Sequence, residues 1–532
     1  MNVLKGATIQ PLFHIILAVT FCCCALNVSA SVHYVDLNST NALPPYTNWS
    51  TAAKSIQDAI DEAVDGDQVL VADGVYSTGG QVLYGVTNRV SITRALIVES
   101  VHGPTTTMIQ GFLDQGPIFS PNCVRCAYVT NGAALIGFTL TNGATSDPGS
   151  GGGVYCESLA ASVSNCVFLS NSVPNLGGGV YSGTLLHCVF AGNSAGSGGG
   201  AYGCVLSNCS FLANLSGFYG GGADSSTLWN CLLATNQAFL GGGAGRSVLN
   251  HCQLFGNVAL DEGGGGARDS TLSNCLLVGN DGGRFGGGTE HCSLNQCTVV
   301  GNFASWAGGV DQSDSTNCIV FQNDAFYTNP NTRDSILDHC CTTPEGGPGS
   351  ITNAPLFTDA AAGNFRLARN SPCINAGNNS TVTVSVDLDS NPRIKGGAVD
   401  IGAYEVQAPT SVISYAWLQQ YGLPTDGSAD LMDPDQDGHN NWQEWIAGTI
   451  PTNSASVLKM LNAVATNNPA GFLVSWQSVP DRVYDMQRSS NLNLHPAFLL
   501  IQTNIPGQTG ITSFLDTNAP EAAFYFYRVS VH

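Results

Sequence analysis

Basic residues are scarce in this sequence. Its 532 residues include 17 Lys and Arg against 38 Asp and Glu, which gives a formal net charge of −21 at pH 7. No lysine occurs between Lys54 and Lys395. Because a nucleic-acid-binding protein needs a basic face to meet the phosphates, this composition argues for a protein with no nucleic acid partner.

Long hydrophobic runs are absent after the N-terminus. One apolar stretch covers 12–26, preceded by Lys5 and followed by the small residues 28–30. This order is typical of a secretory signal peptide, so we expect residues 1–30 to be removed and the mature chain to begin near Ser31. A retained anchor is the alternative. The sequence predicts a secreted or cell-surface protein, a monomer with no membrane span after cleavage.

Glycine is abundant, with 63 residues, but it follows no Gly-X-Y register, which excludes collagen. Apolar residues make up 43% of the chain, enough to bury a large core, which argues against disorder. Glycine triplets recur at intervals of about 22 residues. They begin at Gly151, Gly177, Gly198, Gly220, Gly241, Gly264 and Gly286, with a partial copy at Gly308.

Cysteine and asparagine follow the same period. The cysteines are Cys166, Cys188, Cys209, Cys231, Cys252, Cys275, Cys297 and Cys318. The asparagines, each five residues after its cysteine, are Asn171, Asn193, Asn214, Asn236, Asn257, Asn280, Asn302 and Asn323. A repeat this short cannot bury its apolar face alone, so successive repeats must stack into a solenoid.

Two kinds of solenoid fit this period. The spacing of Leu185, Cys188, Phe190 and Asn193 matches a leucine-rich repeat. After the asparagine, however, the chain runs through Ser, Ala and Gly, which are poor helix formers. We therefore predict an all-β fold, a right-handed single-stranded parallel β-helix with about 22 residues per coil, in which like residues stack about 4.8 Å apart.

The cysteines have two interpretations. In an exported protein they could form disulfides. Parallel Cβ vectors on adjacent coils lie farther apart than the usual 3.8 Å of a bridge, which favours a ladder of buried thiols. Cys123 with Cys126, and Cys340 with Cys341, lie off the ladder and are better candidates for bridges.

Both ends of the repeat region are similar to a known superfamily. The amphipathic segment Ile56 to Ala63 precedes Asp65 to Val71, and the region closes with Ser371 to Gly377 and Val399 to Glu405. Over residues 31–407 these motifs resemble the pectin-lyase-like right-handed β-helix surface proteins of bacteria. The resemblance implies a capping helix at the N-terminal end. It implies no single activity, because the superfamily includes lyases, hydrolases, epimerases and adhesins.

The strand position after each glycine triplet is where neighbouring coils would line up a site. In chain order it carries Tyr155, Tyr181, Tyr202, Asp224, Gly245, Arg268, Glu290 and Asp311. The tyrosines would stack on sugar rings. We expect binding of a polysaccharide or cell-surface glycan, or a structural role in surface adhesion, as the function.

The alternative is a polysaccharide-degrading enzyme, either a glycoside hydrolase or a polysaccharide lyase. Its candidate catalytic residues are Glu290, Asp311, Asp224 and Arg268, because carboxylates about 5–6 Å apart suit glycoside hydrolysis. In a lyase, Arg268 and Arg246 would instead neutralise a uronate.

The histidines are not expected to take part in catalysis. His187, His251 and His291 lie beside the cysteine ladder or in loops, where we expect them to be solvated.

A calcium loop is expected after the solenoid. Asp433, Asp435, Asp437, His439, Asn441 and Glu444 occupy positions 1, 3, 5, 7, 9 and 12 of an EF-hand-type loop, with Gly438 at position 6. This spacing wraps oxygen ligands around one point, with a backbone carbonyl from His439. The loop resembles those of dockerins and thrombospondin-type linkers, and a dockerin carries two of them. We expect calcium here as a cofactor that orders a joint.

The expected domains follow from these features. They are a signal peptide over 1–30, a capped β-helix over 31–407, a calcium-binding segment over 411–452 and a β-sandwich-like module over 456–532. The last module is predicted from half-buried strand patterns separated by Pro and Asn/Gly turns.

Overall fold

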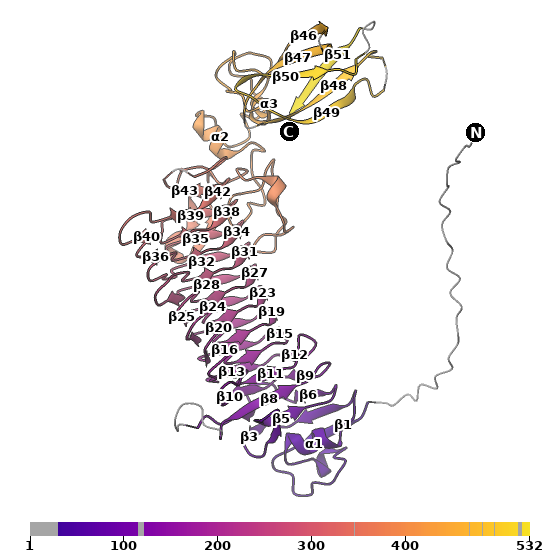
Figure 1. The fold of residues 1–532 in the computed structure, drawn as a ribbon, viewed down its shortest axis with the longest axis vertical. Coiled ribbons are helices and arrows are strands. Elements are labelled where there is room, and N and C mark those ends of the chain that lie inside the picture. Colours follow the sequence, from indigo (N-terminus) through magenta and orange to yellow (C-terminus); the bar gives the residue numbers. More distant parts are fainter. Residues whose placement is uncertain are drawn as a thin grey trace, which may run out of the picture.

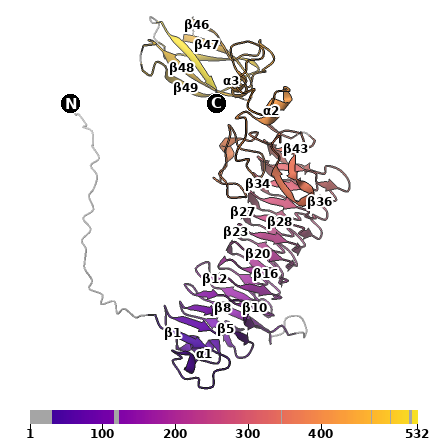
Figure 2. The ribbon, with the colours of Figure 1, turned by 180° about the vertical axis from the view of Figure 1, so that it is seen from behind.

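The computed structural model describes residues 30–114, 122–344, 346–467, 469–480, 482–493, 495–519 and 524–531. Apart from Ala30, the expected signal peptide lies outside these residues. The chain forms a long column of stacked coils, followed by a separate β-module (Figures 1 and 2). No helix in the described ranges is long and apolar enough to cross a membrane.

Three long sheets, which we call A, B and C, run along the column. From residue 154 onward, each coil adds one strand to sheet C, then one to sheet A and then one to sheet B. Neighbouring coils pair in parallel and in register. At the start of sheet C, β4 (Gln81–Leu83) instead pairs antiparallel with β5 (Val86–Ile92). This is the predicted right-handed parallel β-helix.

The strands of each sheet are short. Sheet A contains β1 (Val32–Val35), β2 (Gln68–Val71), β6 (Ile97–Ser100), β9 (Ala134–Ile136), β12 (Ser162–Ser164), β15 (Thr184–Leu186), β19 (Val205–Ser207), β23 (Thr227–Trp229), β27 (Val248–Asn250), β31 (Thr271–Ser273), β34 (Ser293–Asn295), β38 (Asp314–Thr316) and β42 (Ile336–Asp338). Sheet B contains β3 (Gly74–Tyr76), β7 (Thr107–Gln110), β10 (Thr139–Thr141), β13 (Val167–Leu169), β16 (Val189–Ala191), β20 (Ser210–Leu212), β24 (Leu232–Ala234), β28 (Gln253–Phe255), β32 (Leu276–Val278), β35 (Thr298–Val300), β39 (Ile319–Phe321) and β43 (Cys341–Thr342). Sheet C contains β4 (Gln81–Leu83), β5 (Val86–Ile92), β8 (Val124–Val129), β11 (Val154–Cys156), β14 (Val180–Tyr181), β18 (Ala201–Tyr202), β22 (Ala223–Asp224), β26 (Ala244–Gly245), β30 (Ala267–Arg268), β33 (Thr289–Glu290), β37 (Val310–Asp311) and β41 (Thr332–Arg333).

Smaller elements occupy the turns between sheets B and C. They are β17 (Ser194–Ala195), β21 (Leu215–Ser216), β25 (Gln237–Ala238) and β29 (Val258–Ala259) in one sheet, and β36 (Phe303–Ala304) with β40 (Asp324–Ala325) in another. Neighbouring coils therefore pair at these turns as well as in the three long sheets.

The interior of the column is apolar because the three-residue strands of sheets A and B point their middle residue inward. Phe168, Phe190 and Phe211 stack with ring centroids 4.7 and 4.5 Å apart and are fully buried. Glycine triplets leave room for them, since a Cβ on Gly179 would lie 2.9 Å from the Phe190 ring. The first glycine of that triplet, Gly177, has a φ of +66°, which favours glycine.

The asparagine ladder joins the coils at the turn after sheet B. Asn171 donates from its backbone N to Asn193 Oδ1 at 3.0 Å and from Nδ2 to the same oxygen at 2.9 Å. Its Nδ2 also donates to the carbonyl of Leu140 at 3.0 Å. Because the same pattern repeats from coil to coil, these buried amides are satisfied without water.

The cysteine ladder consists of thiols. All sixteen described cysteines are free and buried, so the bridges expected at Cys123 with Cys126 and at Cys340 with Cys341 are not present. Strand alternation explains the second pair, because Cys340 faces the interior cluster and Cys341 faces an outer one. Burial raises the pKa of the ladder thiol Cys166 to about 12, which keeps it protonated.

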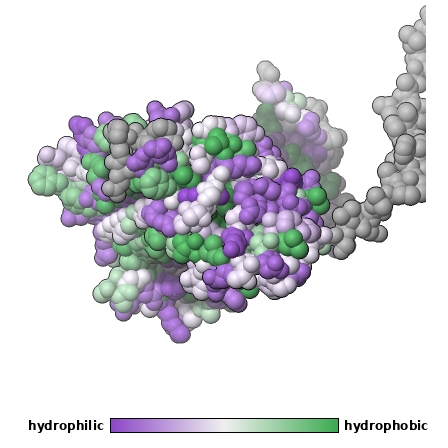
Figure 3. Space-filling model, turned by 90° about the horizontal axis from the view of Figure 1, so that it is seen from below, coloured by the Kyte–Doolittle hydropathy of each residue, from purple (hydrophilic) through white to green (hydrophobic). Residues whose placement is uncertain are grey.

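Helix α1 (Ile56–Glu62) closes the N-terminal end as expected. Ser55 caps it by accepting a hydrogen bond from the backbone N of Asp58, and Ile56, Ala59 and Ile60 are buried against the first coil. A short 3₁₀ turn, η1 (Trp49–Thr51), precedes it. Seen from this end, hydrophilic and hydrophobic residues lie side by side on the surface (Figure 3).

The segment after the last coil covers the outer face of sheet B. Leu276, Val300 and Ile319 point outward there, and Ile374 and Ile401 pack against them in one buried cluster. This explains why the outward positions of the last coils are apolar. The segment includes β44 (Phe357–Asp359), η2 (Ala360–Ala362), β45 (Asn364–Leu367) and η3 (Asn379–Thr381).

A buried polar network fixes this covering segment. The carboxylates of Asp387, Asp400 and Glu405 accept backbone N–H groups, for example Asp400 from Val406 at 2.7 Å and Glu405 from Asp400 at 3.0 Å. Arg393, with a side chain 1% exposed, lies 3.7 Å from Glu405 and donates to Asn274 of the β-helix. The network ties the segment to coils more than a hundred residues earlier.

Two further units follow. The first contains α2 (Tyr415–Gln420) and α3 (Asn441–Ala447). The second consists of the antiparallel sheets β46 (Met460–Asn467), β47 (Ala470–Ser478), β50 (Gly510–Asp516) and β49 (Leu499–Pro506), β48 (Val483–Ser489), β51 (Phe526–Val531). Val474, Trp476, Tyr484 and Met486 form the core between them.

Candidate functional site

Sheet C aligns the expected row of side chains. Its register pairs Tyr155 with Tyr181, Tyr202 with Asp224, Arg268 with Glu290 and Glu290 with Asp311. The row continues to Arg333, which the row predicted from the sequence did not include. Four of the five arginines between residues 122 and 344 lie in or directly after its strands, namely Arg125, Arg246, Arg268 and Arg333.

The tyrosines stack on one another. The ring centroids of Tyr155 and Tyr181 are 5.0 Å apart, and those of Tyr181 and Tyr202 are 5.9 Å apart with only 5° between the ring planes. Tyr128 extends the stack in the N-terminal direction, and Tyr84, which is 86% exposed, stands tilted at its end. Because the inner ring faces are covered, a ligand meets their edges and hydroxyl groups.

A cleft of about 690 Å³ opens over these tyrosines. Arg125 forms part of its wall and donates to Asn88 Oδ1 at 2.7 Å and to the carbonyl of Ser150 at 2.8 Å. Burial lowers the pKa of Arg125 to about 10. Asp147 and Glu157 supply carboxylates to the same wall. The cleft therefore combines rings, hydroxyl groups and charges of both signs.

Asp224 is an ion-pair partner in the middle of the row. It is fully buried, and Arg246 donates to it from Nε at 3.0 Å and from Nη2. Burial raises the pKa of Asp224, and the hydrogen bond from Arg246 opposes this. The Arg246 guanidinium also lies 4.3 Å from the ring centroid of Tyr219. This geometry fixes the carboxylate in place.

Glu290 is the acid of the row whose pKa lies near neutrality. Its side chain is 4% exposed, and its Oε2 lies 2.8 Å from Nη1 of Arg268. Burial raises the pKa of Glu290 to about 7, against the effect of Arg268 and with the help of the nearby charge of Asp311. A carboxyl group with a pKa near neutrality can give or take a proton at physiological pH.

Asp311 is held by its own arginine. Arg333 donates from Nε and Nη2 to the two oxygens of Asp311 at 2.8 and 2.6 Å, and Asp311 is fully buried. Glu290 and Asp311 thus lie on adjacent coils, as the repeat predicts, and each is paired with an arginine. Asp224 lies three coils away from Glu290.

Aromatic residues of the turns flank this end of the row. Phe285 pairs with Trp306 on the next coil, and Trp306 stacks on Tyr327 with centroids 4.7 Å apart. The Arg333 guanidinium lies 4.5 Å from the Phe285 ring centroid. Their spacing of one coil was the signal that could have identified them in the sequence.

The three histidines do not share one environment. His187 and His291 are exposed, as expected. His251 is 8% exposed and stacks on Trp229 at 5.8 Å, so the expectation that it is solvated is wrong. The covering segment accounts for this, since the carbonyl of Val386 lies 3.3 Å from His251 Nε2.

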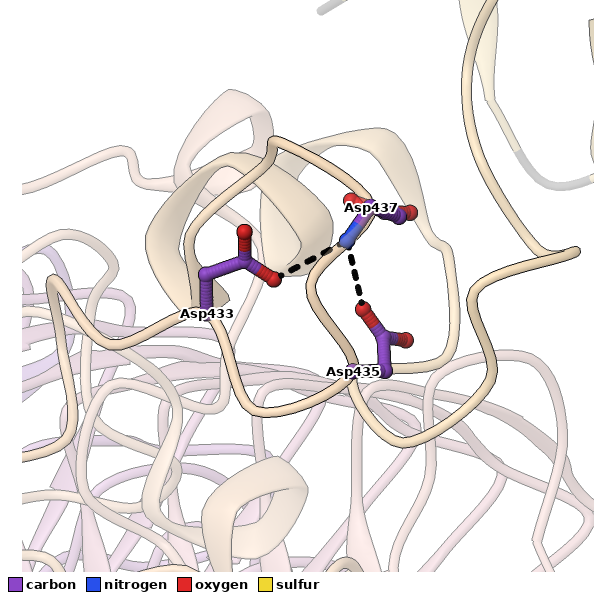
Figure 4. A group of neighbouring side chains, drawn as sticks. All are labelled: Asp433, Asp435 and Asp437. Atoms are coloured by element: carbon purple, nitrogen blue, oxygen red, sulfur yellow. Dashed lines mark hydrogen bonds between the residues drawn. The ribbon is translucent and has the colours of Figure 1, made fainter.

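The Asp433 loop brings oxygen atoms together. One oxygen each from Asp433, Asp435 and Asp437 lies within 4.8 Å of the others (Figure 4). Asp433 and Asp435 both accept the backbone N–H of Asp437 at 3.3 Å, which shapes the turn. His439 Nδ1 lies 3.4 Å from Asp437 Oδ1. These carboxylates could hold a metal ion.

Further oxygens of the loop are buried without a hydrogen-bond partner among the described residues. They are Asp435 Oδ2, Asp437 Oδ2, Asn441 Oδ1 and Glu444 Oε2. Burial and then the charges of Asp435 and Asp437 raise the pKa of Glu444 to about 7. Buried oxygens without hydrogen-bond partners suit a hard cation, which prefers oxygen ligands.

No family model matches the chain, and no curated protein matches it. Among solved structures it is similar to pectate lyase Pel9A, with 16% identity, a TM-score of 0.41 and coverage of 71% of this chain and 97% of that one. It is also similar to a PL6 family alginate lyase, AlyGC, with 12% identity, a TM-score of 0.33 and coverage of 57% and 52%. A polygalacturonase from Erwinia carotovora gives 10% identity, a TM-score of 0.26 and coverage of 61% and 96%. These likenesses concern the fold alone, and the three long parallel sheets by themselves establish a parallel β-helix.

Proposed function

We propose that the protein binds a polysaccharide along the outer face of sheet C. The observation that carries this proposal is the cleft of about 690 Å³ over stacked tyrosines that repeat once per coil. A linear polymer lying along the axis meets the same kind of side chain at each repeating unit. Hydroxyl groups of Tyr155 and Tyr181 hydrogen-bond to the sugar, and Arg125 beside them adds a positive charge.

The test uses the full-length protein and a panel of neutral and acidic soluble polysaccharides, with binding measured by affinity electrophoresis and calorimetry. Tyr155→Ala and Tyr181→Ala should each weaken binding about tenfold, since each removes a hydroxyl hydrogen bond to the sugar that contributes on the order of 1 kcal/mol. Trp229→Ala is the matched control, because Trp229 is 43% exposed on sheet A. Equal binding by all variants, or by none including the parent, contradicts the proposal.

A second candidate function is cleavage of the bound polysaccharide, and the pKa of Glu290 near 7 favours it. As general acid, Glu290 would protonate the glycosidic oxygen of the scissile bond, with the leaving group departing as the alcohol. Asp311 would supply the second carboxylate of a hydrolase, once a substrate displaces its contact with Arg333. In a lyase, Arg268 would bind the uronate carboxylate.

New reducing ends and unsaturated-uronate absorbance separate these reactions. Glu290→Gln should abolish both signals while leaving polysaccharide binding within about twofold of the parent, because it alters a proton donor and not the tyrosine cleft. Asp314→Asn, which removes an exposed carboxyl on sheet A outside the cleft, is the control. Activity that survives Glu290→Gln excludes this residue as the proton donor.

We also propose that the Asp433 loop holds calcium. Asp433, Asp435, Asp437, Asn441 and Glu444 would be side-chain ligands and His439 would add its carbonyl, a set of oxygens that suits this hard cation. The metal would neutralise the clustered carboxylates and order the start of α3. Calorimetric titration with calcium should give one site, and Asp435→Asn should weaken it at least tenfold, whereas Asp426→Asn outside the loop should not.

We also propose that the protein is exported from the cell. An export signal over residues 1–30 would carry the protein to the cell surface or the medium, where polysaccharide is available. Mass spectrometry of the protein recovered from its natural host would test this, since a mature N-terminus near Ser31 is expected.

A further inference from the structure

A cavity of about 940 Å³ lies outside sheet C. It opens where the end of the β-helix meets α2 and α3, and we refer to it as the junction pocket. Its wall includes Asn375 and Asn378 of the covering segment, Trp417 and Gln420 of α2, and Trp445 of α3. A cavity of this size at a domain junction is typical of a ligand site.

The chemistry of the wall is unusual for this protein. Although the chain carries a net charge of −21, none of the described residues that line the pocket is Asp, Glu or Lys. Arg482 contributes the one guanidinium, which donates to the carbonyls of Ile446 at 2.8 Å and Trp445 at 3.0 Å. His339 also lines the pocket, and its Nδ1 lies 2.9 Å from Asp338 Oδ1. Both basic side chains therefore already have partners, and the wall offers little to select an ion of either sign.

Two indole rings give the wall its apolar part. Trp417 and Trp445 are half-buried and pack against the small core of Ile413, Leu418 and Ala429. This packing holds one side of each ring while both rings contribute to the pocket wall. Rigid aromatic rings of this kind bind ligands at low entropic cost.

Amide groups give the wall its polar part. Asn375 is 1% exposed, and its Nδ2 donates to the carbonyl of Ser411 at 2.8 Å while its Oδ1 is buried with no partner among the described residues. Gln419 Nε2 donates to the carbonyl of Asn370 at 2.9 Å. Gln420 is exposed at the rim, and its amide makes no hydrogen bond to the described residues. Amides can both donate to and accept from hydroxyl groups.

We propose that the junction pocket binds an uncharged saccharide. The C–H face of a pyranose ring packs on an indole ring, and its hydroxyl groups both donate and accept, which matches the amides of Asn375, Asn378 and Gln420. A purely apolar ligand would leave these amides without partners, which costs free energy. A charged ligand would find no opposite charge free to meet it. This site is independent of the polymer proposed for sheet C.

The test is calorimetric titration of the full-length protein with neutral gluco-, manno-, galacto- and xylo-oligosaccharides. Calcium is present throughout, because Trp445 and Ile446 belong to α3. We expect one of these sugars to bind with a dissociation constant in the range of micromolar to millimolar. Trp445→Ala should weaken it at least tenfold.

Gln420→Ala is the second test variant, for use if Trp445→Ala disturbs folding, because Gln420 is exposed on α2. This variant should weaken binding about threefold to tenfold. Gln502→Ala, exposed on β49, and Trp229→Ala are the matched controls and should bind as the parent does. Absence of binding by every neutral sugar at millimolar concentration overturns the proposal. So does unchanged binding by Gln420→Ala and Trp445→Ala, or equal affinity for an anionic oligosaccharide. Loss of binding in Tyr155→Ala would assign the sugar to sheet C and overturn the proposal as well, so this site and the function proposed for sheet C fail separately.

Discussion

Replacing Glu290 with glutamine should change how the stability of the protein depends on pH. Burial raises the pKa of Glu290 to about 7 in the folded protein, although Arg268 opposes this, whereas an unfolded glutamate has a pKa of about 4.3. The folded state therefore holds this proton more tightly than the unfolded state. The free energy of unfolding therefore falls as the pH rises from about 4 to about 7. The loss is complete above pH 7 and absent below about pH 4.

The magnitude follows from these two pKa values. At about 1.4 kcal/mol per pKa unit, their difference corresponds to about 3 to 4 kcal/mol in full, of which about 2 to 3 kcal/mol develops between pH 5 and pH 8.5. Screening by solvent is small, because the side chain is 4% exposed. Glutamine has no proton to lose, so the free energy of unfolding of Glu290→Gln minus that of the parent should rise by about this amount over the same range.

Urea unfolding at several pH values between 5 and 8.5, followed by tryptophan fluorescence and circular dichroism, measures this difference. Glu157→Gln is the control, because hydrogen bonds from Thr130 and Asn131 lower the pKa of the exposed Glu157, so it stays ionised throughout. A difference between Glu290→Gln and the parent that does not change with pH would refute the reasoning. A slope of the opposite sign would mean that the contact with Arg268 outweighs burial.

Three further predictions concern the coils, the covering segment and the metal loop. Asn236→Ala removes four side-chain hydrogen bonds of the ladder and should lower the free energy of unfolding by about 4 kcal/mol in urea titrations, against less than about 1 kcal/mol for Asn250→Ala, whose amide makes no hydrogen bond to the described residues. Arg393→Met leaves the buried carboxylates without their cation and should cost about 3 to 5 kcal/mol, seen as faster hydrogen exchange in residues 375–405. Calcium at a hundredfold excess over its dissociation constant should stabilise the protein by about 2.7 kcal/mol in thermal unfolding, an effect that EDTA or Asp435→Asn removes. Equal effects in Asn236→Ala and Asn250→Ala, unchanged exchange in Arg393→Met, or a calcium effect that survives Asp435→Asn would each contradict the corresponding prediction.

The repeat in the sequence determined the fold of the solenoid. Parallel coils pair in register, so a residue type that recurs with the period must stack on its own copies. Asn171 and Asn193 therefore lie in one ladder, and Glu290 and Asp311 lie on adjacent strands of one sheet. The same local logic applies to the Asp433 loop, because the alternation of carboxylates within a few residues already brings their oxygens together.

Only the tertiary structure determined which contacts these side chains make. The sequence indicated a row of tyrosines but not that each ring covers the face of the next, which depends on rotamers shared between coils. It indicated acids and arginines in the row but not which arginine forms an ion pair with which acid. Arg333 pairs with Asp311, for example, across a full coil. The covering of sheet B and the junction pocket join segments far apart in the chain, as when Ile401 packs near Leu276. Spacing within a repeat fixes neighbours along the axis, whereas contacts between the solenoid and the segments that follow it depend on how the whole chain packs.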